Sequence, residues 1–174
     1  MTIANTMYTE LEVEAGTTRR LLERIPADKL SWRPHPKSRT LGQLAMHVAT
    51  IPGALSGFAH LDTFAFETRR TDVDPSDVAE ILAAHDASLV AAKQNLETMD
   101  DAKIMGLWKG TLGGTPVFTV PRAGLLRTVM LNHGYHHRGQ LSVYLRELGV
   151  PLPSIYGPSA DENPFADAMS ASKG

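Results

Sequence analysis

The sequence of 174 residues contains no cysteine. This absence excludes disulfide bonds, cysteine nucleophiles and every metal site that is built on cysteine, because each of them requires a sulfur atom from the chain. A metal ion would have to be bound by histidine, aspartate or glutamate side chains. The possible chemistry is therefore restricted before any motif is considered.

Strong charge of either sign is also absent, since the formal net charge is −2. The chain lacks the basic surface that nucleic-acid phosphates and anionic lipids attract. No apolar run is long enough to span a membrane, and the N-terminus lacks the basic and apolar regions of a signal peptide. We therefore expect a cytoplasmic protein that binds neither nucleic acid nor membrane.

Four segments carry apolar residues at helical spacing, and loops rich in glycine and proline separate them. The predicted helices comprise residues 5–24, 40–60, 75–99 and 121–148. The length suits one domain with its own core. We expect a single all-α domain over residues 1–174, ordered from about 5 to 165, that folds as a four-helix bundle with long loops and an irregular C-terminal tail.

Local signals indicate where two of these helices begin. Thr40 and Gln43 form a T-x-x-Q capping box at the second helix. The third helix is expected to start with Asp74 or Ser76 as its cap. The glycine-rich connection before the last helix is expected to be a long ordered loop, with a short hairpin around residues 113–114.

The last predicted helix contains three histidines within LNHGYHHRGQLSVYLRELG. His133 and His137 are four residues apart, so their side chains lie on one face of the helix and can share a metal ion. His47, on the apolar face of the second helix, is the natural third ligand, because an antiparallel bundle packs the two inner faces together. Three imidazoles leave a coordination position for water or substrate, which is typical of a catalytic site.

A structural interpretation competes with this one, because a histidine on an apolar stripe is usually a hydrogen-bonded core residue and H-x-x-x-H occurs by chance. His136 either replaces one of the pair or supports it, and Gln140 is expected beside the ligands. His85, on the third helix, faces either the same cavity or the core. Four aromatic residues are expected to line a pocket above the metal or to pack in the core: Trp32, Trp108, Tyr135 and Tyr144.

Two longer runs resemble a known family. NHGYHHRGQLSVYLRELGVPLPSIYGPSADE resembles the C-terminal signature of the DinB family, metal-binding four-helix bundles that include the YfiT-like proteins, and LERIPADKLSWRPHPKSRTLGQLAMHVA resembles its first loop and second helix. The resemblance extends from about residue 9 to residue 164. It implies that His47, His133 and His137 bind a divalent ion, zinc or nickel, that His136 lies outside the ligand set, and that the protein is a homodimer.

The resemblance also implies a small-molecule substrate, because some relatives are S-transferases that conjugate a low-molecular-weight thiol to an electrophile. Two alternatives stay open. A metal-dependent hydrolase would require a general base, for which Asp161 and Glu162 in the tail are the candidates. A non-catalytic protein would instead bind a metal or small ligand as part of a stress response.

Overall fold

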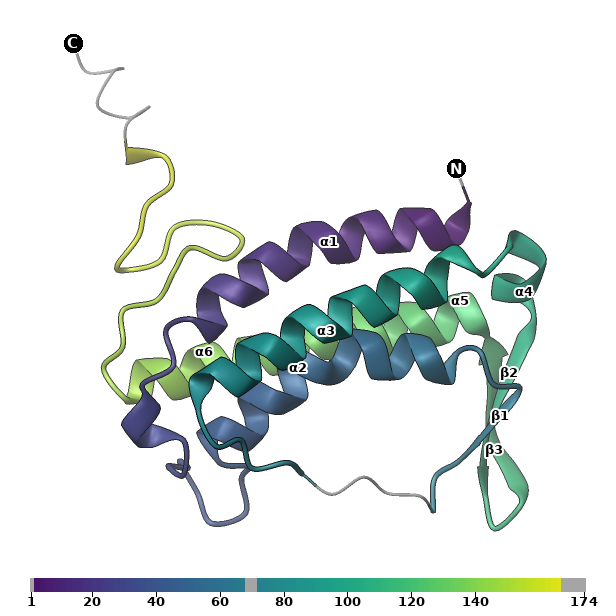
Figure 1. Cartoon of the computed structure of the whole chain (residues 1–174), viewed down its shortest axis with the longest axis horizontal. Coiled ribbons are helices and arrows are strands. Elements are labelled where there is room, and N and C mark those ends of the chain that lie inside the picture. The colour runs from purple at the N-terminus through teal and green to yellow at the C-terminus, as the bar shows by residue number, and fades with distance from the viewer. Residues whose placement is uncertain (1, 68–71, 167–174) are drawn as a thin grey trace.

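The computed structural model describes residues 2–67 and 72–166 and is mostly helical (Figure 1). Three long α-helices are uninterrupted: α1 (Ile3–Leu22), α2 (Leu41–Phe58) and α3 (Val78–Glu97). A fourth helical segment runs from residue 122 to residue 147. A short 3-10 turn, η1 (Ala27–Lys29), lies in the connection between α1 and α2. The four predicted helical regions are thus present.

The beginning of α2 confirms the predicted capping box. The Thr40 hydroxyl accepts a hydrogen bond from the Gln43 backbone N–H at 3.1 Å, and the Gln43 side chain accepts one from the Thr40 N–H at 3.0 Å. Two N–H groups that would otherwise lack partners are satisfied in this way. The helix that carries His47 is therefore fixed firmly at its N-terminus.

The beginning of α3 differs from the prediction. Its cap is Asp77, and neither Asp74 nor Ser76 takes this role. Asp77 has an extended backbone, and its carboxylate accepts a hydrogen bond from the Glu80 N–H at 2.8 Å. Several acidic and hydroxyl residues precede the helix, and the position of the first helical turn decides which of them acts as the cap.

The α2 and α3 helices pack closely against each other. Gly53 makes this possible, because a Cβ atom there would lie 2.9 Å from the Ser88 carbonyl oxygen. The Gly53 N–H donates a hydrogen bond to the Ser88 hydroxyl at 2.8 Å. Pro52 lies inside α2, yet the helix continues to Phe58. In addition α1 packs on α3, and α2 packs on α6 (His133–Glu147), the last part of the fourth segment.

A three-stranded sheet at one end of the helices corrects the all-α prediction (Figure 1). Strand β2 (Leu107–Leu112) pairs in parallel with β1 (Thr63–Ala65) and antiparallel with β3 (Thr115–Pro121). The β2–β3 hairpin turns at Gly113 and Gly114, which both have positive φ angles of 56° and 76°. The predicted hairpin is confirmed, but β-branched and aromatic residues on both sides extend it into a sheet. A short helix, α4 (Asp101–Met105), precedes β2.

The fourth helical segment is not the uninterrupted α-helix that the sequence predicts. It consists of α5 (Arg122–Leu125), a π-helix labelled η2 (Leu126–Asn132), and α6 (His133–Glu147). π-helical turns are rare and often lie at functional sites. Here the π-helix ends immediately before His133, and it packs against α2. Beyond α6 the tail to residue 166 is irregular, as expected.

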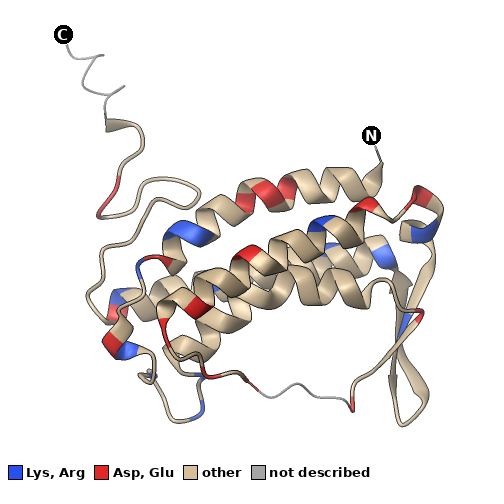
Figure 2. Cartoon of the chain, viewed as in Figure 1, with Lys and Arg blue, Asp and Glu red and all other residues tan. Residues whose placement is uncertain are grey.

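Charged residues are distributed without a concentration of one sign in the view of Figure 2. On α1 three glutamates precede two arginines, and α3 carries residues of both signs. The exception is α2, which contains no lysine, arginine, aspartate or glutamate. No helix in the described ranges has an apolar stretch long enough to cross a membrane.

Candidate metal centre

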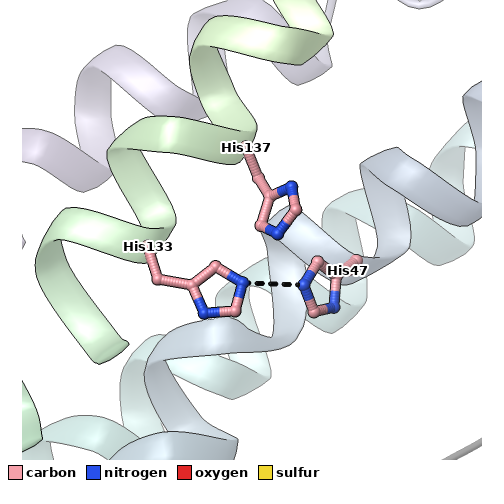
Figure 3. Close-up of side chains that lie close together, drawn as sticks. All are labelled: His47, His133 and His137. Atoms are coloured by element: carbon pink, nitrogen blue, oxygen red, sulfur yellow. Dashed lines mark hydrogen bonds between the residues drawn. The ribbon is translucent and has the colours of Figure 1, made fainter. Parts of the chain in front are cut away.

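Three histidines meet between α2 and α6 (Figure 3). His47 comes from α2, while His133 and His137 are one helical turn apart on α6. One ring nitrogen from each side chain lies within 4.8 Å of those from the other two, and we refer to this group as the histidine cluster. None of the three is an exposed residue. The helices thus bring together the three side chains that the sequence predicted as ligands.

The spacing of the nitrogens fits a single metal ion. Tetrahedral zinc with Zn–N bonds of about 2.0–2.1 Å requires nitrogens about 3.3 Å apart. The Nε2 atoms of His47 and His133 are 3.3 Å apart. A hydrogen bond between these two rings also accounts for that distance, but it does not explain why His137 points at the same place. Its ring centroid lies 4.5 Å from that of His47 and 4.4 Å from that of His133.

The rings are held in their neutral form, which is the form that binds metal. Burial lowers the pKa of His47 and that of His137 to about 4, and burial also lowers the pKa of His133. The positive charge of Arg39 acts in the same direction on all three pKa values. Each ring therefore keeps a nitrogen lone pair at neutral pH.

These shifts predict that the metal-free protein loses stability in acid. In the unfolded chain a histidine takes up its proton near pH 6.5, whereas His47 and His137 do so near pH 4 in the fold. The unfolded state therefore binds more protons between these values, and stability falls as the pH is lowered from 6.5 to 4. Each ring contributes about 1 kcal/mol after allowance for solvent screening. Unfolding with urea at several pH values measures the effect.

A matched pair of variants tests this prediction. His137→Gln should reduce the loss of stability between pH 6.5 and pH 4, because one depressed pKa is removed. His35→Gln, which changes an exposed histidine outside the cluster, should leave that loss unchanged. Equal pH dependence in the wild type and in His137→Gln would show that the cluster does not control acid stability.

Gln140 orients one ring of the cluster. The Nδ1–H of His137 donates a hydrogen bond to the Gln140 side-chain oxygen at 2.7 Å. An amide oxygen only accepts, so the proton of His137 is on Nδ1 and the Nε2 lone pair is free for a metal. His136 is exposed, and its ring centroid is 5.0 Å from that of His137. Both residues that the sequence predicted near the ligands are exposed, and Gln140 is the one that forms a hydrogen bond with a ring of the cluster.

The other two candidate residues lie away from the cluster. His85 is 2% exposed, and its Nδ1 has no hydrogen-bond partner in the described part of the chain. It lines a separate cavity of about 30 Å³ together with Glu14 and Tyr135. Tyr144 stacks edge-on against Trp32 with a centroid distance of 5.6 Å.

A pocket of about 220 Å³ opens beside the cluster, and its lining differs from the aromatic lining that the sequence suggested. His47 and His133 form part of its wall, and we call it the histidine pocket. Its charged side chains are Arg39 and Asp72, whose Nε and Oδ1 atoms are 2.8 Å apart. Arg39 lies just before α2 and Asp72 just before α3, so only the packing of α2 on α3 makes them neighbours. None of the four aromatic residues considered above lines this pocket.

Comparisons with known proteins agree with this architecture. A family model described as DinB family matches residues 1–165. The uncharacterized protein YrdA of Bacillus subtilis strain 168 is 29% identical over 153 residues, which cover 87% of this chain and 86% of YrdA. The similarity therefore extends over nearly the whole length of both proteins.

Two crystal structures are similar to this fold. A DinB-like protein from Bacillus cereus ATCC 10987 has a TM-score of 0.66 and 26% identity, over 86% of this chain and 95% of its own. The DinB-like protein YjoA from Bacillus subtilis has a TM-score of 0.68 and 20% identity, over 86% of this chain and 97% of its own. Because YjoA is only 20% identical, its similarity shows a shared fold alone.

Proposed function

The chain belongs to the DinB family, and from this premise we propose that it is a metal-dependent enzyme that transfers a low-molecular-weight thiol to an electrophile. His47, His133 and His137 would hold the divalent ion, zinc or nickel. The observation that carries the proposal is that three neutral imidazoles converge and that two of them, His47 and His133, line a pocket. A ligand in that pocket could reach the cluster directly.

The residues around the cluster suit an anionic sulfur nucleophile. A bound divalent ion supplies a Lewis acid that lowers the pKa of a coordinated thiol. Arg39 adds a positive charge whose effect extends to all three histidines. Gln140 fixes the orientation of the His137 ring. The apolar wall of the pocket reduces access of water to the reacting groups.

Thiol ligation can be tested without relying on turnover. Cobalt(II)-loaded protein, titrated with 2-mercaptoethanol, is expected to develop a saturable thiolate-to-metal absorption band, because thiol and histidines would share the ion. Conjugation of the same thiol to monochlorobimane is then measured on the zinc-loaded protein. Cobalt that binds stoichiometrically but gives no such band would contradict the proposal. His136→Ala, which changes an exposed residue beside the cluster, serves as the control that keeps the band.

Hydrolysis is a second candidate, favoured by one observation. Asp72 brings a carboxylate to the histidine pocket, where it could act as a general base. The two tail carboxylates considered from the sequence are engaged elsewhere, since Asp161 pairs with Arg146 and Glu162 with Arg20. Turnover of p-nitrophenyl acetate by the zinc-loaded protein, without any thiol band in the cobalt form, would favour hydrolysis.

A non-catalytic role is the third possibility, in which the ion only joins α2 to α6 or reports a bound ligand in a stress response. A site that excludes azide, together with a stabilising effect of metal and no turnover, would favour it. We further infer that the four long helical segments form the four-helix bundle of this family, since α2 packs on α3 and α6 and α1 packs on α3. A homodimer and a cytoplasmic location stay predictions.

A further inference from the structure

The histidine pocket has two chemically different parts. One part contains six polar or charged residues: Arg39, Gln43, His47, Thr50, Asp72 and His133. The other part is apolar and is formed by six side chains: Met46, Ile51, Ala54, Leu55, Phe58 and Val73. A ligand that fills both parts must itself combine a polar end with an apolar body. The volume of about 220 Å³ limits it to a small molecule, because drug-sized ligands occupy roughly 300–1,000 Å³.

Arg39 is positioned to receive an anion at the polar part. Its Nε donates to Asp72 Oδ1 at 2.8 Å, which fixes the plane of the guanidinium group. In the described part of the chain the two terminal amino groups have no hydrogen-bond partner. The side chain is 34% exposed, so it is sheltered but accessible. Two parallel N–H groups match the geometry of a carboxylate.

The charge balance favours a single negative charge. Among the described residues that line the pocket, Arg39 and Asp72 are the only ones with charged side chains. Asp72 would repel a ligand that carries several negative charges, such as a phosphate ester. The exposed face of Arg39 attracts a ligand that carries a single negative charge. Arg39 also acts electrostatically on all three histidines, so an anion bound to it would lie near the cluster.

We propose that the histidine pocket binds a small amphipathic carboxylate, with Arg39 binding the carboxylate and the side chains around Leu55 and Phe58 enclosing the apolar body. That this carboxylate belongs to the thiol substrate rests on the function proposed above. Arg39 is then the residue that selects the substrate, and the histidine cluster is the part that reacts with it. Thiols without an anionic group would bind more weakly.

A pair of ligands and a pair of variants test the pocket itself. Zinc-loaded and metal-free protein are titrated calorimetrically with 4-phenylbutyrate and with 4-phenylbutanamide, which differ only in the charged group. The wild type is expected to bind the acid about 10-fold more tightly than the amide, since one charge-assisted bidentate contact provides about 1.4 kcal/mol or more. Arg39→Gln should bind the acid no more tightly than the amide, because Asp72 is then the remaining charged side chain among the described lining residues. Arg33→Gln, which removes the same charge at an exposed position outside the pocket, should keep the wild-type preference.

The other outcomes of these titrations also decide whether the pocket binds a carboxylate through Arg39. Equal binding of acid and amide by the wild type would overturn the proposal, and so would a preference that survives in Arg39→Gln. A preference that requires zinc but not Arg39 would also overturn it, because the carboxylate would then bind the metal. Unchanged circular dichroism and zinc content in Arg39→Gln exclude a folding defect. Phe58→Ala should weaken both ligands by a similar factor, because it shortens the apolar part.

The link to the thiol is tested separately. Cobalt-loaded protein is titrated with 3-mercaptopropionate and with 3-mercaptopropanamide, and the thiolate band reports binding of either. A lower dissociation constant for the acid that disappears in Arg39→Gln supports the substrate assignment. Bands of equal affinity would overturn the assignment and leave the thiol transferase function standing. No band with either thiol would contradict that function, while the calorimetric result on 4-phenylbutyrate would still decide whether the pocket binds carboxylates.

Discussion

His133→Ala is expected to lose zinc affinity by more than about 100-fold, because one of three ligands disappears and even residues that only support a ligand account for about 10- to 100-fold. His133 supplies the Nε2 atom that lies 3.3 Å from that of His47. Competition with a chromophoric chelator measures the affinity, and elemental analysis of untagged protein measures the metal content.

Two neighbours on the same helix provide graded controls for this prediction. His136→Ala should bind zinc like the wild type, because His136 is exposed and outside the cluster. Gln140→Ala should lose about 10-fold, because the His137 ring is no longer held by its hydrogen bond. A larger loss in His136→Ala than in His133→Ala would show that the wrong histidine has been assigned. Circular dichroism confirms that each variant is folded.

Arg138→Met is expected to lower the free energy of unfolding by about 3–5 kcal/mol, the usual cost of removing one partner from a buried ion pair. Arg138 is 2% exposed, and its Nη2 lies 2.7 Å from Glu14 Oε2, whose side chain is 17% exposed. It also donates hydrogen bonds to the Glu14 carbonyl oxygen and to the hydroxyls of Thr18 and Tyr156. Its guanidinium lies 5.2 Å from the ring centroid of Tyr135. The substitution leaves the Glu14 carboxylate without its ion-pair partner, with the Tyr156 hydroxyl as a remaining donor at 3.0 Å.

Urea denaturation of the metal-free protein measures this loss. Arg146→Met is the matched control, because Arg146 is exposed and pairs with Asp161 at the surface, so its loss should not exceed about 1 kcal/mol. Equal losses in the two variants would show that the contacts of Arg138 with Glu14 and Thr18 do not hold α6 against α1. A combined Arg138→Met and Glu14→Leu variant should recover part of the stability, since no unpaired charge then stays buried.

The position of Arg138 shows what helical periodicity could and could not predict. The stripe of His133, His137 and Leu141 follows directly from steps of four, and the structure turns this face toward α2. A second inward face, with Arg138 and Leu145, contacts α1 and the tail. A prediction from the sequence pattern places an arginine at the surface. Burial of an arginine depends on partners at distant positions in the chain, which the pattern does not reveal.

Two features of the fold were not predicted from the sequence, for a related reason. The π-helix η2 contains no proline or glycine that would indicate a break in the α-helix. Its wide turn follows from packing rather than from local preference. The sheet needs β1, a three-residue strand more than 40 residues before β2. Short strands become stable only when a partner is present, so propensity alone did not reveal them.

The sequence by itself determined the four helical regions, the cap of α2, the hairpin turn and the three histidines, because helical periodicity, capping and turn chemistry are all local. The family, too, is determined by the sequence, as the match over residues 1–165 shows. Only the tertiary structure decided that Arg39 and Asp72 meet beside the cluster and that an apolar pocket opens there. The physical reason is that a pocket is formed by side chains from separate elements, and its position depends on how closely those elements pack.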